Sequence, residues 1–190
     1  MRPARFLVLL AMIVTGAAAH AQRAAPQPFD ATGTVQVAFT PWDDAEGMIV
    51  AAIEEARRQI LVQAYSFTSR RIASALIAAR KRGVEVLITA DRDQARSGES
   101  SRIPQLAASG IPVFLETRYA AAHSKVMVID GESRDPTVIT GSYNWSGGAQ
   151  RRNAENVLVL RRNRDLARAY VENWQRHRAG AEPYLAKLRR

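Results

Sequence analysis

The strongest constraint on the fold of this chain is a strand–helix–strand pattern near its middle. Ile60–Phe67 reads ILVQAYSF, a run that is apolar on both faces, as in a strand buried between two layers. Apolar residues then recur at helical spacing from Ile72 to Lys81, and Gly83 stands where helices commonly end. Val84–Ala90 is a second apolar strand. This order of elements predicts a sheet covered by helices.

Other segments continue the alternation of strands and helices. Asp43 or Asp44 is placed to cap a helix whose apolar positions run from Met48 to Ala56. A polar loop is expected from Asp91 to Ser101. The expected fold class is therefore α/β: an α/β/α sandwich with a mixed, largely parallel sheet flanked by helices. The other predicted strands are 35–39, 111–115, 125–129, 137–140 and 157–160, and the other predicted helices are 103–108 and 165–178.

The N-terminal segment has the pattern of a secretory signal. Arg2 and Arg5 precede the short apolar run Phe6–Val14, and Ala-His-Ala at 19–21 supplies the small residues that signal peptidase recognises. The run is short for a membrane span, although an uncleaved anchor is the alternative. We expect a periplasmic or secreted protein without stable membrane insertion after cleavage. The expected parts are a signal peptide at 1–21, a flexible lead-in at 22–33, one domain at 34–180 and a basic tail at 181–190.

Charge and cysteine content narrow the possible functions. The chain has 27 Lys and Arg residues against 18 acidic ones, a formal net charge of +9, and loss of the two leader arginines leaves +9 − 2 = +7. Such an excess favours polyanions such as nucleic acid, although many basic proteins are merely soluble. The absence of cysteine excludes disulfides, thiol nucleophiles and cysteine-based zinc sites.

The candidate catalytic residues begin with His123, Lys125 and Asp130. Side chains alternate along a strand, so His123 and Lys125 are expected on the same side, roughly 6.6–7 Å apart. Such a pair can share one phosphate, with the imidazole facing phosphorus and the ammonium neutralising an oxygen. Asp130 lies an odd number of positions from Lys125, which favours a structural hydrogen-bonding role.

A second group of candidates follows between residues 141 and 156. Gly141 permits a close or left-handed backbone beside a ligand. Ser142 and Asn144 are short donors suited to phosphate oxygens. Glu155 is a candidate catalytic residue that could accept a hydrogen bond from the other imidazole nitrogen, fixing its tautomer. Each residue taken alone fits an ordinary structural role, and only the joint pattern indicates a phosphate site.

The joint pattern resembles the signature of the phospholipase D superfamily, His-x-Lys-x4-Asp followed by Gly-Ser-x-Asn. It stands here as HSKVMVID and GSYN. The resemblance extends over roughly residues 35–176 to small bacterial endonucleases of that superfamily that carry one motif per chain. One departure is the spacing of ten residues, 131–140, between Asp130 and Gly141, which is longer than usual in the family. Further similar segments are AYSFT at 64–68, ALIAARKRGVEV at 75–86, SGIPV at 109–113 and NAEN at 153–156.

The resemblance implies a mechanism and an assembly. Family members use two motifs in one active site, and this chain has one, because His177 lacks matching Lys and Asp residues and is interpreted as a surface residue of the last helix. A homodimer with the site across its two-fold interface is therefore expected. One His123 would form a phosphohistidine, and the second would protonate the leaving oxygen and then activate water.

The sequence predicts catalysis without a metal or other cofactor. Two histidines remain after the leader, and Asp91-Arg92-Asp93, the nearest acidic group, is interpreted as a solvated loop. Arg151 and Arg152 immediately precede Glu155 and are candidates to bind flanking phosphates. We find no base-reading module, so sequence-nonspecific cleavage of DNA and/or RNA is expected. The alternatives are a phospholipase D or cardiolipin-type lipid hydrolase, and a catalytically silent nucleic-acid-binding protein.

Overall fold

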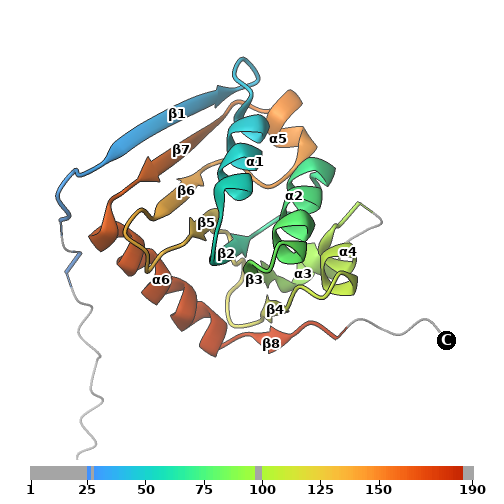
Figure 1. The fold of residues 1–190 in the computed structure, drawn as a ribbon. Helices are drawn as coiled ribbons and strands as arrows, with labels where there is room; N and C mark the ends of the chain where they lie inside the picture. The colour runs from blue at the N-terminus through green and yellow to red at the C-terminus, as the bar shows by residue number, and fades with distance from the viewer. Residues whose placement is uncertain (1–24, 27, 97–99, 186–190) are drawn as a thin grey trace, which may run out of the picture.

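The computed structural model describes residues 25–26, 28–96 and 100–185. The predicted signal peptide lies outside these residues. In the described part, eight strands form one sheet (Figure 1). The strands are β1 Thr34–Thr40, β2 Gln59–Ala64, β3 Glu85–Asp91, β4 Val113–Glu116, β5 Val126–Ile129, β6 Thr137–Gly141, β7 Glu155–Arg161 and β8 Glu182–Pro183. The helices are α1 Ala45–Glu55, α2 Arg70–Lys81, α3 Arg92–Arg96, α4 Ile103–Ala108, α5 Gly147–Arg151 and α6 Arg164–Ala179.

The sheet is mixed, as predicted, but mostly antiparallel, so the expectation of a largely parallel sheet was wrong. Its order is β1-β7-β6-β5-β2-β3-β4-β8. Only β2–β3 and β3–β4 are parallel, and the other five of the seven pairings are antiparallel. The physical reason is connection length, because parallel neighbours need a crossover such as α2, whereas β5 and β6 are joined by a short turn. A strand that is apolar on both faces can belong to either a parallel or an antiparallel pair here, since helices cover this sheet on both sides.

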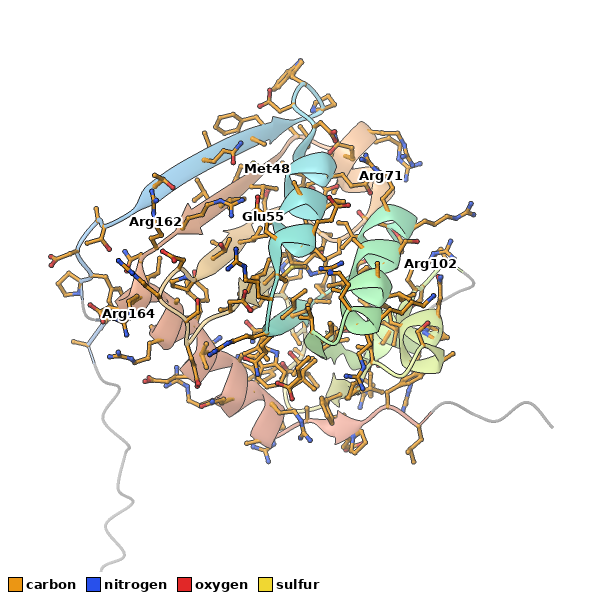
Figure 2. The ribbon with its side chains drawn as sticks, viewed as in Figure 1. Met48, Glu55, Arg71, Arg102, Arg162 and Arg164 are labelled. Atoms are coloured by element: carbon orange, nitrogen blue, oxygen red, sulfur yellow. The ribbon has the colours of Figure 1, made fainter. Side chains whose placement is uncertain are left out.

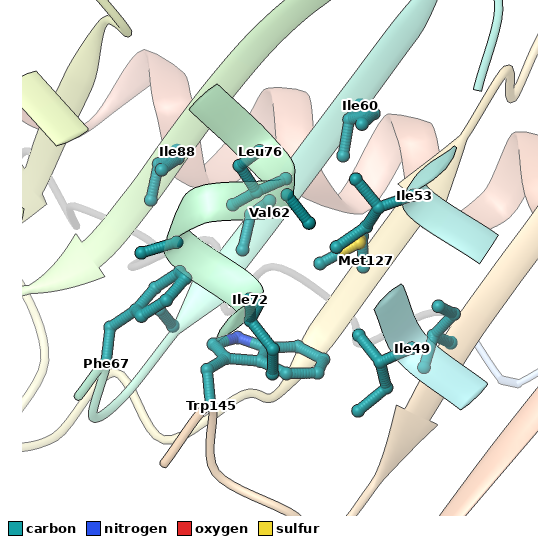
Figure 3. Close-up of a cluster of buried hydrophobic side chains, with 14 of the residues drawn as sticks. Ile49, Ile53, Ile60, Val62, Phe67, Ile72, Leu76, Ile88, Met127 and Trp145 are labelled. Carbon is teal, nitrogen blue, oxygen red and sulfur yellow. The ribbon is translucent and has the colours of Figure 1, made fainter. Parts of the chain in front are cut away.

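The two faces of the sheet carry separate hydrophobic clusters. The larger cluster lies between the sheet and helices α1 and α2, with Ile53, Leu76 and Trp145 among its buried members (Figure 3). The smaller cluster lies on the other face under α6, which contributes Val171 and Trp174. Both buried indole N–H groups are satisfied, because Trp145 and Trp174 donate to carbonyl oxygens of β2 at 3.0 Å. The middle of β2 is therefore fixed from both sides.

Local sequence signals account for several element boundaries. The Asp44 side chain caps α1 by accepting from the Gly47 N–H, and Ser69 caps α2 in the same way. The loop expected at residues 91–101 contains the short helix α3. The sheet also continues past the predicted domain boundary at residue 180, because β8 pairs with β4. Residues 186–190 of the predicted tail lie outside the described residues.

Candidate active site

An open hollow of about 400 Å³ lies where the chain enters β5. The sheet supplies its floor from β2, β5 and β6, and α6 forms one wall. Three of the predicted site residues, His123, Lys125 and Ser142, line it together. Its complete lining is Gln63, His123, Ser124, Lys125, Val126, Thr140, Gly141, Ser142, Tyr170 and Asn173.

His123 and Lys125 meet at the mouth of this hollow. Both precede β5, which begins at Val126, so the strand geometry expected for them does not apply. Their side chains nevertheless converge, with Lys125 Nζ 2.7 Å from His123 Nδ1 and 2.5 Å from the His123 carbonyl oxygen. His123 is exposed, whereas Lys125 is 6% exposed. Burial lowers the pKa of Lys125, and the negative charge of Glu155 opposes that shift.

Tyr65 completes the surroundings of this pair. Its ring lies 4.2 Å from the His123 ring, centroid to centroid, at an interplanar angle of 56°. The Lys125 ammonium nitrogen lies 5.0 Å from the centre of the same ring, within the range of a cation–π contact. Tyr65 follows β2 directly, so the rigid middle of the sheet holds the imidazole in place.

The Gly-Ser-x-Asn segment forms the opposite side of the hollow. Gly141 has φ +150°, and a Cβ there would lie 2.2 Å from the Asn156 carbonyl oxygen, so the close approach is to β7 rather than to a ligand. Ser142 is exposed, and its Oγ accepts the Asn156 N–H at 3.0 Å. Asn144 does not line the hollow, and its Oδ1 is buried without a hydrogen-bond partner in the described part of the chain.

Glu155 does not contact His123 within one chain. Its carboxylate accepts from Asn153 Nδ2 at 2.9 Å, and no hydrogen bond joins it to the imidazole in the described residues. Its influence on the site is electrostatic, through Lys125. The expected orientation of the imidazole by Glu155 is therefore not supplied by this geometry.

Asp130, predicted as a catalytic residue with a structural hydrogen-bonding role, lies outside the hollow, at the far end of β5. Its carboxylate accepts three backbone N–H groups, from Arg57 at 2.9 Å, Arg58 at 2.8 Å and Gln59 at 2.9 Å. Asp130 also has φ +51°, a left-handed conformation that aspartate tolerates better than most residues. These bonds tie the end of β5 to the start of β2, which is the structural role that its spacing predicted.

Arg151 and Arg152 are likewise absent from the hollow around His123. Both are exposed and line a neighbouring hollow between α5 and the start of α2. These two arginines, predicted to bind flanking phosphates, therefore lie on a different surface from the one that holds His123.

Sequence reasoning missed several residues of the site. Gln63 lines the hollow and is 2% exposed, with Nε2 lacking a partner in the described residues. It is a polar residue between the apolar residues Val62 and Ala64 of β2, a signal that could have found it. Asn173 lines the same hollow one helical turn after Tyr170, which the sequence indicated only as part of an apolar helix face.

Two interpretations of polar residues near the site need correction. Asp91 is 6% exposed rather than solvated, and its carboxylate accepts the N–H groups of Asp93, Gln94 and Ala122. The bond to Ala122 fixes the segment that leads directly to His123. His177 is not a simple surface residue, because its Nδ1 lies 2.8 Å from the buried carboxylate of Glu116.

Comparison with known proteins identifies the fold family. Residues 49–178 match the family model described as cardiolipin synthase, PLD-like domain, which is more than half of the chain. The chain belongs to the phospholipase D superfamily. The resemblance in HSKVMVID and GSYN is thereby confirmed.

Relatives within the phospholipase D superfamily carry names of different kinds. A protein named phospholipase D from Rickettsia prowazekii is 39% identical over 140 residues, covering 74% of this chain and 65% of that protein. Mitochondrial cardiolipin hydrolase from Xenopus tropicalis is 30% identical over 135 residues, covering 70% of this chain and 61% of that protein. The chain thus spans less than two thirds of the length of these two relatives.

Solved structures of the phospholipase D superfamily align over nearly their whole lengths. Nuc from Salmonella typhimurium, a phospholipase D family member, is 35% identical with a TM-score of 0.74, covering 80% of this chain and 97% of Nuc. NucT from Helicobacter pylori is 25% identical with a TM-score of 0.72, covering 80% of this chain and 99% of NucT.

Neither a metal cluster nor a membrane-spanning helix is found in the described part of this phospholipase D superfamily member. No three His, Asp or Glu side chains there gather closely enough to hold a metal ion. No helix in residues 25–26, 28–96 and 100–185 is long and apolar enough to cross a bilayer.

Proposed function

We propose that this phospholipase D superfamily phosphodiesterase hydrolyses nucleic acid without a metal ion and without sequence specificity, in the periplasm or outside the cell. The observation that carries the proposal is the convergence of an exposed imidazole, His123, with a buried ammonium, Lys125, at an open hollow. The net charge of +9 and the similarity to Nuc and NucT support a polyanionic substrate. The signal-like leader supports export.

The proposed chemistry proceeds in two displacements. His123 attacks phosphorus, and a P–N bond forms as the P–O ester bond breaks, while His123 of a second copy donates its proton to the leaving oxygen. That second imidazole then removes a proton from water, which attacks phosphorus and breaks the P–N bond. Lys125 and Ser142 hold the non-bridging oxygens and balance their developing charge. The two imidazoles need opposite protonation states, which coupling between close titrating groups favours.

The proposed assembly is a homodimer, because one chain supplies one His123. The sheet edge offers an apolar face for this contact, defined by Val35, Val37 and Phe39 of β1, which are 64%, 47% and 50% exposed. Phe39 pairs with Asn156 of β7, whose N–H bonds to Ser142. In the sheet order, β1 is two strands from β6, which leads into Ser142, and three strands from β5, which follows His123. With neighbouring strands about 4.8 Å apart, this apolar face lies within about 15 Å of the site. A second copy packed there would bring the two sites together.

The same apolar face also favours a second candidate function, hydrolysis of phospholipid. Trp42, next to the apolar face of β1, is 82% exposed, and exposed aromatic residues beside a phosphate site suit contact with a lipid surface. The names of the Rickettsia and Xenopus relatives point in the same direction. This surface could not be predicted from the sequence, because Val35–Phe39 has the ordinary alternation of a half-covered strand.

The decisive experiment uses the full mature protein in excess EDTA, beside His123→Ala. Plasmid DNA, single-stranded DNA, RNA and cardiolipin vesicles are offered separately. We expect wild type to degrade nucleic acid and the variant to bind DNA without cleaving it. Recovery only after a divalent ion is added would contradict metal independence. Cleavage of vesicles with nucleic acid left intact would replace the proposal with the lipid alternative, and binding without any hydrolysis would replace it with the catalytically silent one.

The dimer is tested by a charge placed on the apolar face of β1. Val37→Glu is expected to convert dimers to monomers in sedimentation equilibrium and to abolish most activity at low protein concentration. Gln36→Glu adds the same charge at an exposed position one residue away, pointing to the opposite side of the strand, and is the matched control. A Val37→Glu protein that remains dimeric and active would show that the interface lies elsewhere.

A further inference from the structure

A second hollow beside the active site is lined by five arginines from three separate elements. Arg70 and Arg71 begin α2, and Arg102 directly precedes α4. Arg151 is the last residue of α5, and Arg152 follows it directly. Figure 2 shows Arg71 and Arg102 on the same side of the molecule. We call this hollow the arginine groove. Residues 70, 102 and 151 are far apart in sequence, so the fold rather than a local charge run creates it.

The positive charge of the arginine groove is largely uncompensated. Only Arg71 has carboxylate partners in the described part of the chain, at 3.3 Å from Glu46 and 3.8 Å from Asp44. Glu46 is 5% exposed, and Ser69 also donates to it, so this buried acid is already satisfied by its neighbours. Four arginines remain without a carboxylate partner among the described residues.

Space for the guanidinium groups is built into α5. A Cβ at Gly147 would lie 2.6 Å from Arg151 Nη2, and one at Gly148 would lie 3.1 Å from Arg152 Nη2. The two arginine side chains therefore lie across glycine backbone instead of extending away from the molecule. Arg102 also has a buried Nε without a hydrogen-bond partner in the described residues. The groove thus contains donors that the protein itself leaves unused.

Two chain segments run from the active site to the arginine groove. One segment carries Gln63 in the active-site hollow and Arg70 in the groove, and the other carries Ser142 and then Gly147. They are joined at Trp145, whose carbonyl oxygen accepts from Thr68 at 2.8 Å and Ser69 at 2.9 Å, and whose indole donates to the Gln63 carbonyl oxygen at 3.0 Å. The two hollows are therefore parts of one rigid surface.

We propose that the arginine groove binds the phosphodiester backbone of the nucleic acid on one side of the bond that is cut, an inference that rests on the proposed function. Gly147 is five residues from Ser142, which places the groove at most about 18 Å from the active site. One strand of B-form nucleic acid carries a phosphate about every 3.4 Å, so the groove meets phosphates within about five nucleotides of the scissile one. Arginine suits this task, because its planar group holds phosphate oxygens in pairs.

A charge-matched pair of variants tests the arginine groove. Arg70→Gln combined with Arg102→Gln removes two positive charges from it. Arg80→Gln combined with Lys81→Gln removes the same charge from exposed positions at the other end of α2. Each protein is offered a single-stranded oligonucleotide of about 30 nucleotides, a dinucleotide and bis-p-nitrophenyl phosphate. The single variant Arg70→Gln, at an exposed position, serves as a second test if the double variant does not fold.

The expected result is a loss that depends on substrate length. KM for the long oligonucleotide rises at least about 10-fold in the groove variant, and the dependence of log KM on log salt becomes shallower by about 1.4, the value for two lost phosphate contacts on a single strand. Hydrolysis of the two small esters stays unchanged, and the α2 control changes KM less than about 2-fold. Equal effects of the two double variants, or an equal loss on the small esters, would overturn the inference.

A binding measurement distinguishes failure of the proposed function from failure of the arginine groove. If wild type hydrolyses no nucleic acid, binding of the long oligonucleotide to His123→Ala protein is measured over a range of salt. A salt dependence that becomes shallower with the groove substitutions supports the arginine groove even then, and an unchanged one rejects it.

Discussion

The two ends of strand β5 carry different parts of one motif, His-x-Lys-x4-Asp. They differ in how many hydrogen-bond or ion-pair partners the protein itself supplies to their polar side chains. At the start of the strand, His123 is exposed, and Lys125 is buried beside it with no ion pair to a carboxylate among the described residues. At the other end, Asp130 accepts three backbone N–H groups. The first end therefore holds groups that are available to a ligand, and the other end holds a carboxylate that the fold itself binds through three hydrogen bonds.

A motif residue can be required either to bind a ligand or to stabilise the fold, and this difference separates the two reasons. A buried ammonium without a carboxylate partner costs stability, so its presence suggests selection for a ligand of opposite charge. A carboxylate bonded to three N–H groups contributes stability, and that of Asp130 lies outside the active-site hollow. Substitutions at the two ends should therefore affect different measurements, activity at the first and the free energy of unfolding at the second.

His123→Ala is expected to have the largest effect. Loss of the proposed nucleophile should lower the rate of phosphodiester hydrolysis by at least about four orders of magnitude. Because the imidazole is exposed, the free energy of unfolding should change by less than about 0.5 kcal/mol. Initial rates and urea denaturation measure the two quantities on the same preparation. A variant with wild-type rates would remove His123 from the mechanism.

Lys125→Met should lower the rate by roughly two to three orders of magnitude, because the charge that stabilises the phosphate oxygens is lost. The substitution should not destabilise the fold, since a methionine of similar length avoids the cost of burying an ammonium. We expect the free energy of unfolding to be unchanged or higher. A large loss of stability in urea denaturation would show that Lys125 holds the fold together rather than the substrate.

Asp130→Ala should show the reverse pattern. Three hydrogen bonds to a charged acceptor disappear, and the free energy of unfolding should fall by about 2–3 kcal/mol. The rate per folded molecule should stay within about twofold of wild type, because the carboxylate lies outside the active-site hollow. Asp130→Asn is the matched control, since asparagine keeps an acceptor and tolerates φ +51°. A rate loss comparable to that of Lys125→Met would restore Asp130 to the catalytic residues.

The sequence predicted the local elements and the family better than the arrangement of the sheet. Apolar runs located β2 and β3, a capping aspartate located the start of α1, and helical spacing with Gly83 located α2, because these signals act over a few residues. Strand direction depends on how distant segments pair, and the apolar run at Val126–Ile129 reads the same in either direction. Spacing along a strand correctly separated Asp130 from Lys125, although the structure places Lys125 just before β5.

Contacts between distant segments explain what the sequence could not supply at the site. Tyr65 and Gln63 reach His123 and the hollow only because β2 lies next to β5. Arg151 and Arg152 follow the site in sequence, yet α5 turns them toward α2. Glu155 is close in sequence to the Gly-Ser-x-Asn segment, but β7 directs its carboxylate to Asn153. Proximity along the chain did not predict these orientations.

Glu155→Gln is expected to have the smallest effect, and its sign follows from the pKa of Lys125. Burial lowers that pKa, and the carboxylate of Glu155 partly restores it, so removal of the negative charge should lower it further. Hydrolysis needs the protonated ammonium, so the alkaline limb of the pH–rate profile should move to lower pH. The rate at the optimum should remain within about threefold.

A pH–rate profile also separates the two roles of Glu155. If Glu155 orients the imidazole of His123, as in a hydrolytic triad, Glu155→Gln should lower the rate at every pH by about two orders of magnitude or more, with no shift of the alkaline limb. The position of Glu155 within one chain favours the shift, because its carboxylate bonds to Asn153 and not to the imidazole. A uniform loss would therefore mean that the carboxylate reaches His123 only in the assembled protein, and that the site at the start of β5 is completed by the second copy.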